Sequence, residues 1–77
     1  MRVKIKLFGS HAHRAGIQSG REIQRVCSNT ATVSDLLKEL DIGDTSATVS
    51  VNGTIKKSDH ILLEGDYVSI YDLLEGG

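Results

Sequence analysis

An amphipathic stretch at residues 33–40 constrains the fold of this chain most strongly. Its apolar side chains recur at i, i+3, i+4 and i+7, the spacing of one helix face. They are Val33, Leu36, Leu37 and Leu40. A helix of this length spans only about 12 Å, which is too short to be stable alone in water. It must therefore pack on a sheet, and we expect an α+β domain.

The helix has a start signal and a candidate stop. Thr32 is the expected N-cap, because its hydroxyl can accept a backbone N–H of the first turn. Asp35 resembles the acidic member of a capping box, and its charge suits the helix dipole. Gly43 is the expected left-handed residue at the C-terminal end.

The clearest strand is predicted at residues 2–7, where apolar and basic residues alternate with a period of two. Glycines and serines interrupt the alternation at residues 8–20, so we expect a long hairpin loop there. A second strand is predicted near residues 22–27. Its Ile23 and Val26 have opposite parity, which a bulge or burial on both faces would explain.

More strands are predicted after the helix. Residues 47–51 alternate again, and Asn52-Gly53 favours a two-residue type I′ turn because both residues need positive φ. A short return strand is expected at Thr54-Ile55 and the last strand at residues 67–71. The connector between them is expected to close the core edge with Ile61, Leu62 and Leu63.

The overall composition argues against several classes of protein. A chain of 77 residues buries only roughly 60% of its unfolded surface, which leaves little room for a deep catalytic cleft. Its net charge of −1 lacks the basic bias of non-specific nucleic-acid binding. The sequence also lacks a transmembrane run and the apolar core of a signal peptide. We expect a cytoplasmic protein, monomeric when free, with no nucleic-acid or membrane partner.

The sequence shows no pattern typical of a catalytic or metal site. No acid–base pair, phosphate loop or nucleophile–base pattern stands out, so no catalytic residue is predicted. His11 and His13 supply two possible ligands where closed zinc sites need four, and Cys27 and His60 are not at zinc-ligand spacing. Cys27 is expected to be a small buried or half-buried apolar residue. We expect no bound metal and no bound cofactor.

The last residues have a different character. Residues 72–77 have no predicted partner strand and end in Gly76-Gly77, so we expect a domain at 1–71 and a flexible tail at 72–77. Either Leu73 and Leu74 anchor a partner groove, or one of them folds back on the sheet edge. Asp72, Glu75 and the terminal carboxylate form an acidic tip that would steer the tail into a basic groove.

Together these features resemble the prokaryotic ubiquitin-like sulfur carriers. This family comprises the small subunit of molybdopterin synthase (MoaD), the thiamine-pathway carrier (ThiS) and the archaeal small modifier proteins. The resemblance rests on the order of elements and on three motifs: Val51-Asn52-Gly53, Leu63-x-Gly65-Asp66-x-Val68-x-Ile70 and Gly76-Gly77. It implies a β-grasp fold: a mixed sheet of four to five strands, one helix across one face, and the first and last strands parallel at the centre.

The N-terminal part is similar to the molybdopterin synthase subunit. That similarity lies in Leu7-Phe8-Gly9-Ser10 and Arg14-Ala15-Gly16. The histidines of the first loop and the tail Asp72-Leu73-Leu74-Glu75 depart from that subunit's pattern. The tail is not far from a ubiquitin-type tail of alternating leucine and charge, so protein modification remains open.

The resemblance implies a function for the C-terminus. An adenylating enzyme of the E1 type would use ATP to activate the Gly77 carboxylate, and sulfide or persulfide would convert it to a thiocarboxylate. The sulfur would then pass, through the large subunit of molybdopterin synthase or another sulfur-accepting enzyme, into a molybdopterin or tungstopterin cofactor. The residues expected to contact partners are Phe8, Tyr71, Leu73, Leu74, Glu75 and Gly76.

Three alternatives remain beside this interpretation. The activated tail would also serve a carrier for tRNA thiolation or thiamine synthesis, or a modifier joined to lysines. A passive β-grasp interaction module would not use the tail at all. Phe8 and Tyr71 are also typical of core or rim aromatics.

Overall fold

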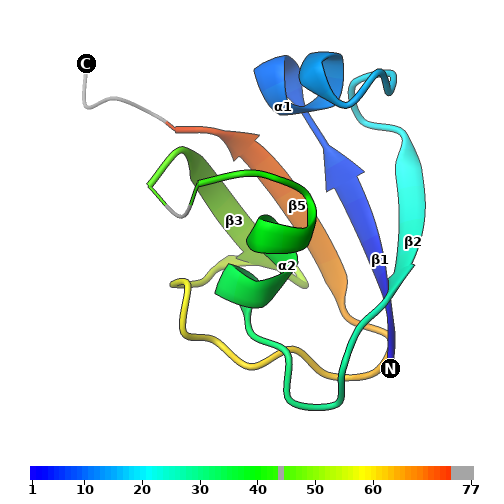
Figure 1. The fold of residues 1–77 in the computed structure, drawn as a ribbon, viewed down its shortest axis with the longest axis vertical. Helices are drawn as coiled ribbons and strands as arrows, with labels where there is room; N and C mark the ends of the chain where they lie inside the picture. The colour runs from blue at the N-terminus through cyan, green and yellow to red at the C-terminus, as the bar shows by residue number, and fades with distance from the viewer. Residues whose placement is uncertain (44, 74–77) are drawn as a thin grey trace.

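The alternating segments assemble into a mixed five-stranded sheet. The structure is a computed structural model that describes residues 1–43 and 45–73. In chain order its elements are β1 (Arg2–Leu7), α1 (Gly9–Arg14), β2 (Glu22–Val26), α2 (Val33–Glu39), β3 (Ala47–Val51), β4 (Thr54–Ile55) and β5 (Tyr67–Asp72). Figure 1 shows α2 lying across one face of the sheet. Within these residues, no helix is long and apolar enough to cross a membrane.

The sheet order is β2-β1-β5-β3-β4. The central strands β1 and β5 are parallel, with Ile5 opposite Val68. Each is flanked on its outer side by an antiparallel strand, β2 on β1 and β3 on β5. The expected α+β class and the central parallel pair are confirmed, and this is the β-grasp arrangement that the resemblance implied.

The core fills the space between the sheet and α2. The residues of β1 that the alternation places inward are all buried, namely Val3, Ile5 and Leu7. The predicted helix stripe faces them with Val33, Leu36 and Leu37, which are also buried. The two periods, two along the strand and 3.6 along the helix, therefore meet in one core.

The predicted start of α2 is confirmed, but its predicted end is wrong. The Asp35 N–H donates to Thr32 Oγ1 at 3.2 Å, and the Thr32 N–H donates to Asp35 Oδ2 at 3.0 Å, a complete capping box. The left-handed residue is Asp41, with φ 59°, and not Gly43. The Ile42 N–H donates to the Leu37 carbonyl at 2.8 Å, as in a Schellman motif. Aspartate tolerates this conformation better than most residues.

The long loop expected at residues 8–20 contains a second helix, α1. Only Ala12 of this helix is buried, so its sequence has no apolar period to detect.

Helix α1 ends in a Schellman motif, as α2 does. Gly16 has φ 71°, and the Ile17 N–H donates to the Ala12 carbonyl at 2.9 Å. The pair Gly16-Ile17 after a short polar run was the available signal.

Two other local predictions also need correction. Strand β2 pairs with β1 without interruption from Val26 to Glu22, so neither a bulge nor burial on both faces explains its parity. Ile23 is half-buried, whereas Val26 is 72% exposed. In the connector before β5, Leu62 is buried, but Ile61 and Leu63 are exposed.

The predicted turn after β3 also fixes the start of β5. Asn52 and Gly53 have φ 53° and 86°, as a type I′ turn requires. The Asn52 amide donates to the buried carboxylate of Asp66 at 2.9 Å, and Asn52 Oδ1 accepts the Tyr67 N–H at 3.0 Å. This network therefore anchors the first residue of the strand that leads to the tail.

Candidate functional site

Two predicted contact residues meet where β5 ends. The Phe8 and Tyr71 rings stack with their centroids 4.7 Å apart and their planes 11° apart. Tyr71 is 39% exposed. The Phe8 N–H donates to the Ile70 carbonyl at 3.0 Å, so the backbones beside the two rings are also joined. We call these two residues the aromatic platform.

A glycine makes room for the platform. A Cβ at Gly20 would lie 3.3 Å from the Phe8 ring, and Gly20 has φ +82°. The Gly20 N–H donates to the Leu7 carbonyl at 2.8 Å, which holds the loop against the end of β1. Phe8 is therefore held between Tyr71 and this loop.

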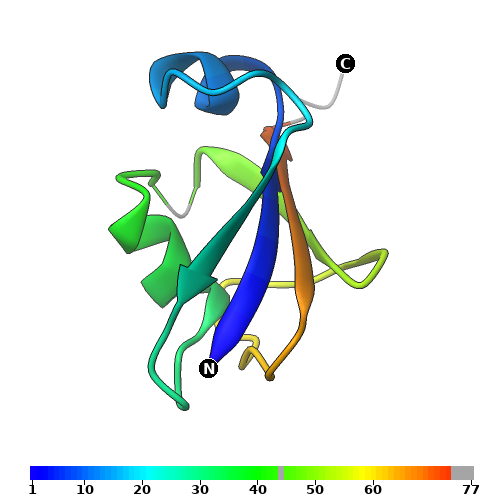
Figure 2. The same cartoon turned by 90° about the vertical axis from the view of Figure 1, so that its right-hand side faces the viewer.

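The platform lies on the sheet face opposite α2. Along β5, Val68 and Ile70 are buried beneath α2, so Tyr67 and Tyr71 point to the other face. In Figure 2 the sheet is turned, and neither helix covers that face. The Tyr67 hydroxyl donates to Glu22 at 2.5 Å, which raises the pKa of Tyr67, and Lys6 Nζ lies 5.5 Å from its ring centroid.

The remaining predicted contact residues follow β5. Leu73 comes directly after β5 and is 49% exposed. Leu74, Glu75, Gly76 and Gly77 lie outside the described residues. The binding role of all these residues, and the role of Gly77, remain predictions.

Asp72, the described member of the predicted acidic tip, is hydrogen-bonded to α1. It is the last residue of β5, and its carboxylate accepts from the Ser10 hydroxyl at 2.6 Å and from the Ser10 N–H at 3.1 Å. The Ser10 hydroxyl, followed by the Ser10 N–H, lowers the pKa of Asp72. The sequence did not reveal this contact, because the two residues are 62 positions apart.

His11 attaches α1 to Ser46, the residue before β3. Its Nε2 lies 2.8 Å from the Ser46 carbonyl oxygen and 3.8 Å from Asp72 Oδ1. A carbonyl only accepts, so Nε2 carries the hydrogen. His11 therefore has a structural role, because it donates a hydrogen bond that joins α1 to the residue before β3. Among the described residues, no group of three or more His, Cys, Asp or Glu side chains is arranged to hold a metal ion.

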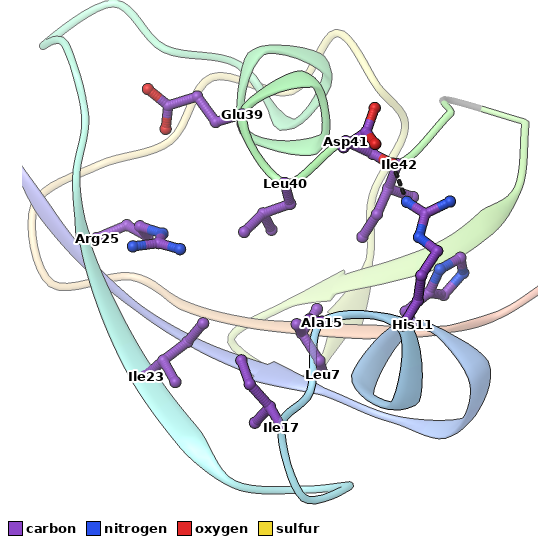
Figure 3. Close-up of a pocket in the computed structure, with 11 residues that line it drawn as sticks. Leu7, His11, Ala15, Ile17, Ile23, Arg25, Glu39, Leu40, Asp41 and Ile42 are labelled. Carbon is purple, nitrogen blue, oxygen red and sulfur yellow. Dashed lines mark hydrogen bonds between the residues drawn. The ribbon is translucent and has the colours of Figure 1, made fainter.

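A pocket of about 320 Å³ lies between α1, β2 and the end of α2. Figure 3 shows aliphatic side chains from several elements pointing toward one another, with Arg25 and Glu39 on one side of them and Asp41 and His11 on the other. The aliphatic residues are Leu7, Ala15, Ile17, Ile23, Leu40 and Ile42, and the charged ones include Arg14, Arg25, Glu39 and Asp41. The Arg14 guanidinium donates to the Asp41 carbonyl, which joins α1 to the end of α2.

Cys27 is buried and free, as predicted. Burial raises the pKa of its thiol, and nearby Glu39 adds to this. A thiol with a raised pKa is mostly protonated at neutral pH and is a poor nucleophile. Cys27 is therefore a packing residue.

The sequence model of the ThiS family matches residues 5–77, which is nearly the whole chain. This protein belongs to the ThiS family. The ThiS family consists of small ubiquitin-like carrier and subunit proteins, in agreement with the resemblance drawn from the sequence. No curated protein matches the chain in sequence.

Solved structures support the ThiS-family fold over the whole chain. Small archaeal modifier protein 1 from Haloferax volcanii matches with a TM-score of 0.74 and 22% identity, covering 100% of both chains. A Pyrococcus furiosus protein described as molybdopterin converting factor subunit 1 matches at 0.79 with 24% identity, over 96% of this chain and 99% of that one. The H. volcanii HVO 2177 protein matches at 0.82 with 22% identity, over 100% and 87%. At these identities the likeness establishes the fold.

Proposed function

We propose that this ThiS-family protein is a sulfur carrier whose Gly77 carboxylate is adenylated and then thiocarboxylated by partner enzymes. The observation that carries the proposal is the family match, which extends through residue 77. The chain places two glycines at positions 76 and 77, where the absence of a Cβ suits passage through a narrow channel. In this proposal the protein is a co-substrate and uses no bound cofactor of its own.

The first step activates a poor acyl donor. An oxygen of the Gly77 carboxylate attacks the α-phosphorus of ATP in an adenylating partner of the E1 type. A carboxylate–phosphorus bond forms as the bond to pyrophosphate breaks, and pyrophosphate leaves. The resulting acyl-adenylate has AMP as a good leaving group.

The second step introduces sulfur. Hydrosulfide, supplied as a co-reactant by a sulfur donor, attacks the acyl carbon, AMP leaves with its oxygen, and the thiol proton passes to solvent. The thiocarboxylate sulfur then attacks an electrophilic carbon of the acceptor. A carbon–sulfur bond forms as a carbon–oxygen bond of the acceptor breaks, the oxygen leaves as water after protonation, and the product is a thioester. Hydrolysis of this thioester leaves sulfur on the acceptor and restores the Gly77 carboxylate.

For the acceptor we propose a molybdopterin or tungstopterin precursor, bound by a large synthase subunit. This choice is supported by the Leu7-Phe8-Gly9-Ser10 segment and by the likeness to the P. furiosus protein described as molybdopterin converting factor subunit 1. In the proposed complex both partners contact the aromatic platform and Leu73. The Phe8 N–H is hydrogen-bonded to the Ile70 carbonyl of β5, so a partner that docks on the aromatic platform also fixes the strand from which the tail continues.

Intact-mass measurement tests the chemistry. The protein is incubated with the E1-type enzyme encoded in the same genome, MgATP and sulfide. We expect one oxygen of the terminus to be replaced by sulfur. A matched variant with one alanine added after Gly77 should remain unchanged, because its carboxylate is on a residue with a side chain. An unmodified wild-type terminus, or equal conversion of both proteins, would refute the proposal.

The platform is tested by binding. Tyr71→Ala should weaken the affinity for the adenylating enzyme about tenfold or more, because truncation of an energetically important interface aromatic costs more than about 1 kcal/mol. Ile55→Ala is the matched control, since Ile55 is 71% exposed on the edge strand β4. Titration calorimetry measures both. Equal affinities for the two variants would show that partners dock elsewhere.

A second candidate function is conjugation of the same activated end to lysines. It is favoured by the full-length likeness to small archaeal modifier protein 1. No Lys or Arg follows Lys57, so trypsin would leave the long remnant 58–77 on a modified lysine. Cleavage after Glu75 would leave Gly-Gly, which is easier to identify by mass spectrometry. Remnants found on other proteins' lysines would support conjugation, and their absence from cells that contain the thiocarboxylate would exclude it.

A further inference from the structure

The end of β5 is held by a contact outside the sheet. Its last pairs with β3 are Tyr71 with Thr48 and Asp72 with Ala47. Terminal pairs of this kind fray easily, because few further bonds hold them. Here the Asp72 carboxylate also accepts from the hydroxyl and the N–H of Ser10, at 2.6 and 3.1 Å. We call this contact the Asp72 clamp.

The chain leaves space for the clamp at the residue before Ser10. A Cβ at Gly9 would lie 2.5 Å from Asp72 Oδ2 and 2.9 Å from its Cγ. Gly9 also has φ +60°, a conformation that favours glycine. Its N–H donates to Ser19 Oγ at 3.1 Å. The Asp72 carboxylate therefore packs directly on the backbone of the first turn of α1.

The helix that provides the clamp is itself fixed. A helix of six residues has little stability alone. It is held by buried Ala12, by the bond from His11 to the Ser46 carbonyl, and by the bond from Arg14 to the Asp41 carbonyl. These contacts attach α1 to the start of β3 and to the end of α2. The clamp therefore joins β5 to a helix that is itself bonded to two other parts of the fold.

We infer that Asp72 is a positioning residue for the reaction at Gly77, and that the Asp72 clamp fixes the point from which the tail starts. This inference rests on the proposed function. Five residues follow Asp72, and an extended chain spans at most about 3.5 Å per residue, so the distance from the clamp to Gly77 can be at most about 17 Å. If β5 frays, the starting point moves and fewer tails reach the α-phosphorus in a reactive geometry.

The clamp and the aromatic platform should affect different kinetic constants. The platform binds the partner, so its loss should raise KM. The clamp acts after docking by orienting the tail, so its loss should lower kcat and leave KM nearly unchanged. Misplacement of a reacting group by a small distance lowers rates by about tenfold or more.

The experiment measures ATP–pyrophosphate exchange by the E1-type enzyme as a function of carrier concentration. Asp72→Ala should lower kcat about tenfold with KM within about twofold. Asp59→Ala is the matched control, because it removes the same charge from an exposed turn in the connector before β5. Ser10→Ala should lower kcat less, because its N–H remains, and Ser10→Thr should keep wild-type kcat.

Several outcomes would overturn the inference. Equal kcat for Asp72→Ala and Asp59→Ala would do so. The same holds if the double variant Ser10→Ala/Asp72→Ala loses the full product of the two single reductions in kcat, because two residues of one contact should not act independently. Amide hydrogen exchange separates positioning from unfolding, since Asp72→Ala should speed exchange at Tyr71 and Asp72 but leave the core strands unchanged. Failure of the wild-type protein to support exchange would overturn the proposed function itself.

Discussion

The helices α2 and α1 lie beside the same sheet, but different forces hold them. Helix α2 buries Val33, Leu36 and Leu37 and closes its own first turn with a capping box. Helix α1 buries Ala12 and is otherwise fixed by polar contacts to other elements. The comparison indicates that α2 is part of the core, whereas α1 is a support for the end of β5. Truncations of the buried face of α2 should therefore lower global stability, and removal of the polar contacts of α1 should act mainly at the start of the tail.

The largest effect is expected from Leu36→Ala. Leu36 is fully buried at the centre of α2, and such truncations cost about 2–5 kcal/mol through lost burial and the cavity left behind. Urea unfolding followed by circular dichroism measures the change. Leu73→Ala, at an exposed leucine, is the control and should change the free energy of unfolding by less than about 0.5 kcal/mol. Similar losses for the two variants would contradict the assignment of α2 to the core.

Gly9→Ala should have the next largest effect. Alanine at a left-handed position costs about 1–2 kcal/mol, and here its Cβ would also collide with the Asp72 carboxylate. Gly65→Ala is the control, because Gly65 has φ +81° but a Cβ added there would meet nothing within 4 Å. We expect the greater loss of stability in Gly9→Ala, together with shifted NMR signals at Ser10 and Asp72. Equal losses of stability in the two variants would show that the Asp72 carboxylate can move away from the new Cβ without destabilising the protein.

Comparing Thr32→Ala with Ser10→Ala contrasts the two helices directly. Loss of the Thr32 cap should cost about 1 kcal/mol of unfolding free energy, because α2 is part of the cooperative core. Ser10→Ala should cost less and appear mainly as faster amide exchange at the end of β5. Urea unfolding and hydrogen exchange on both variants provide the test. The contrast fails if Ser10→Ala slows or speeds exchange throughout the core.

The smallest effect concerns pH. The pKa of Asp35 is lowered by the Thr32 N–H and hydroxyl, and that of Asp72 by the Ser10 hydroxyl and N–H. Because these pKa values are lower in the folded state, the stabilisation is complete above the unfolded value of about 3.9. It is lost as pH falls through the folded pKa below that value.

Urea unfolding between about pH 2 and 6 measures this dependence. Asp35→Asn and Asp72→Asn should each flatten the acid limb of the stability curve and leave its slope near neutral pH unchanged. In Asp72→Asn the change should be accompanied by faster exchange at Tyr71, whereas Asp35→Asn should not affect that amide. Acid limbs that match the wild type in both variants would contradict the assigned bonds.

The sequence predicted those parts of the fold that have a period or a local rule. The alternation in β1, the stripe and cap of α2, and the turn at Asn52-Gly53 all depend on neighbours within a few residues. The stop at Gly43 was wrong because the helix ends earlier and Asp41 takes the left-handed position. Helix α1 was missed because a single buried alanine leaves no pattern.

The candidate site was predictable only in part. The aromatic platform follows from strand parity and the adjacent ends of β1 and β5. The Asp72 clamp joins residues 62 positions apart, and no local rule pairs a serine with an aspartate at that distance. The residue in the sequence that reflects this contact is Gly9. It needs a positive φ and leaves space for the Asp72 carboxylate, but the sequence does not show that Asp72 lies beside it.

The central place of β5 has a mechanical consequence. The strand that leads to the tail is bonded to β1 on one side and β3 on the other. Tension applied along it would load both ladders in shear at once, whereas an edge strand such as β4 can be peeled away bond by bond. An enzyme that pulls on the last residues would therefore move the domain as a whole before it could unravel it.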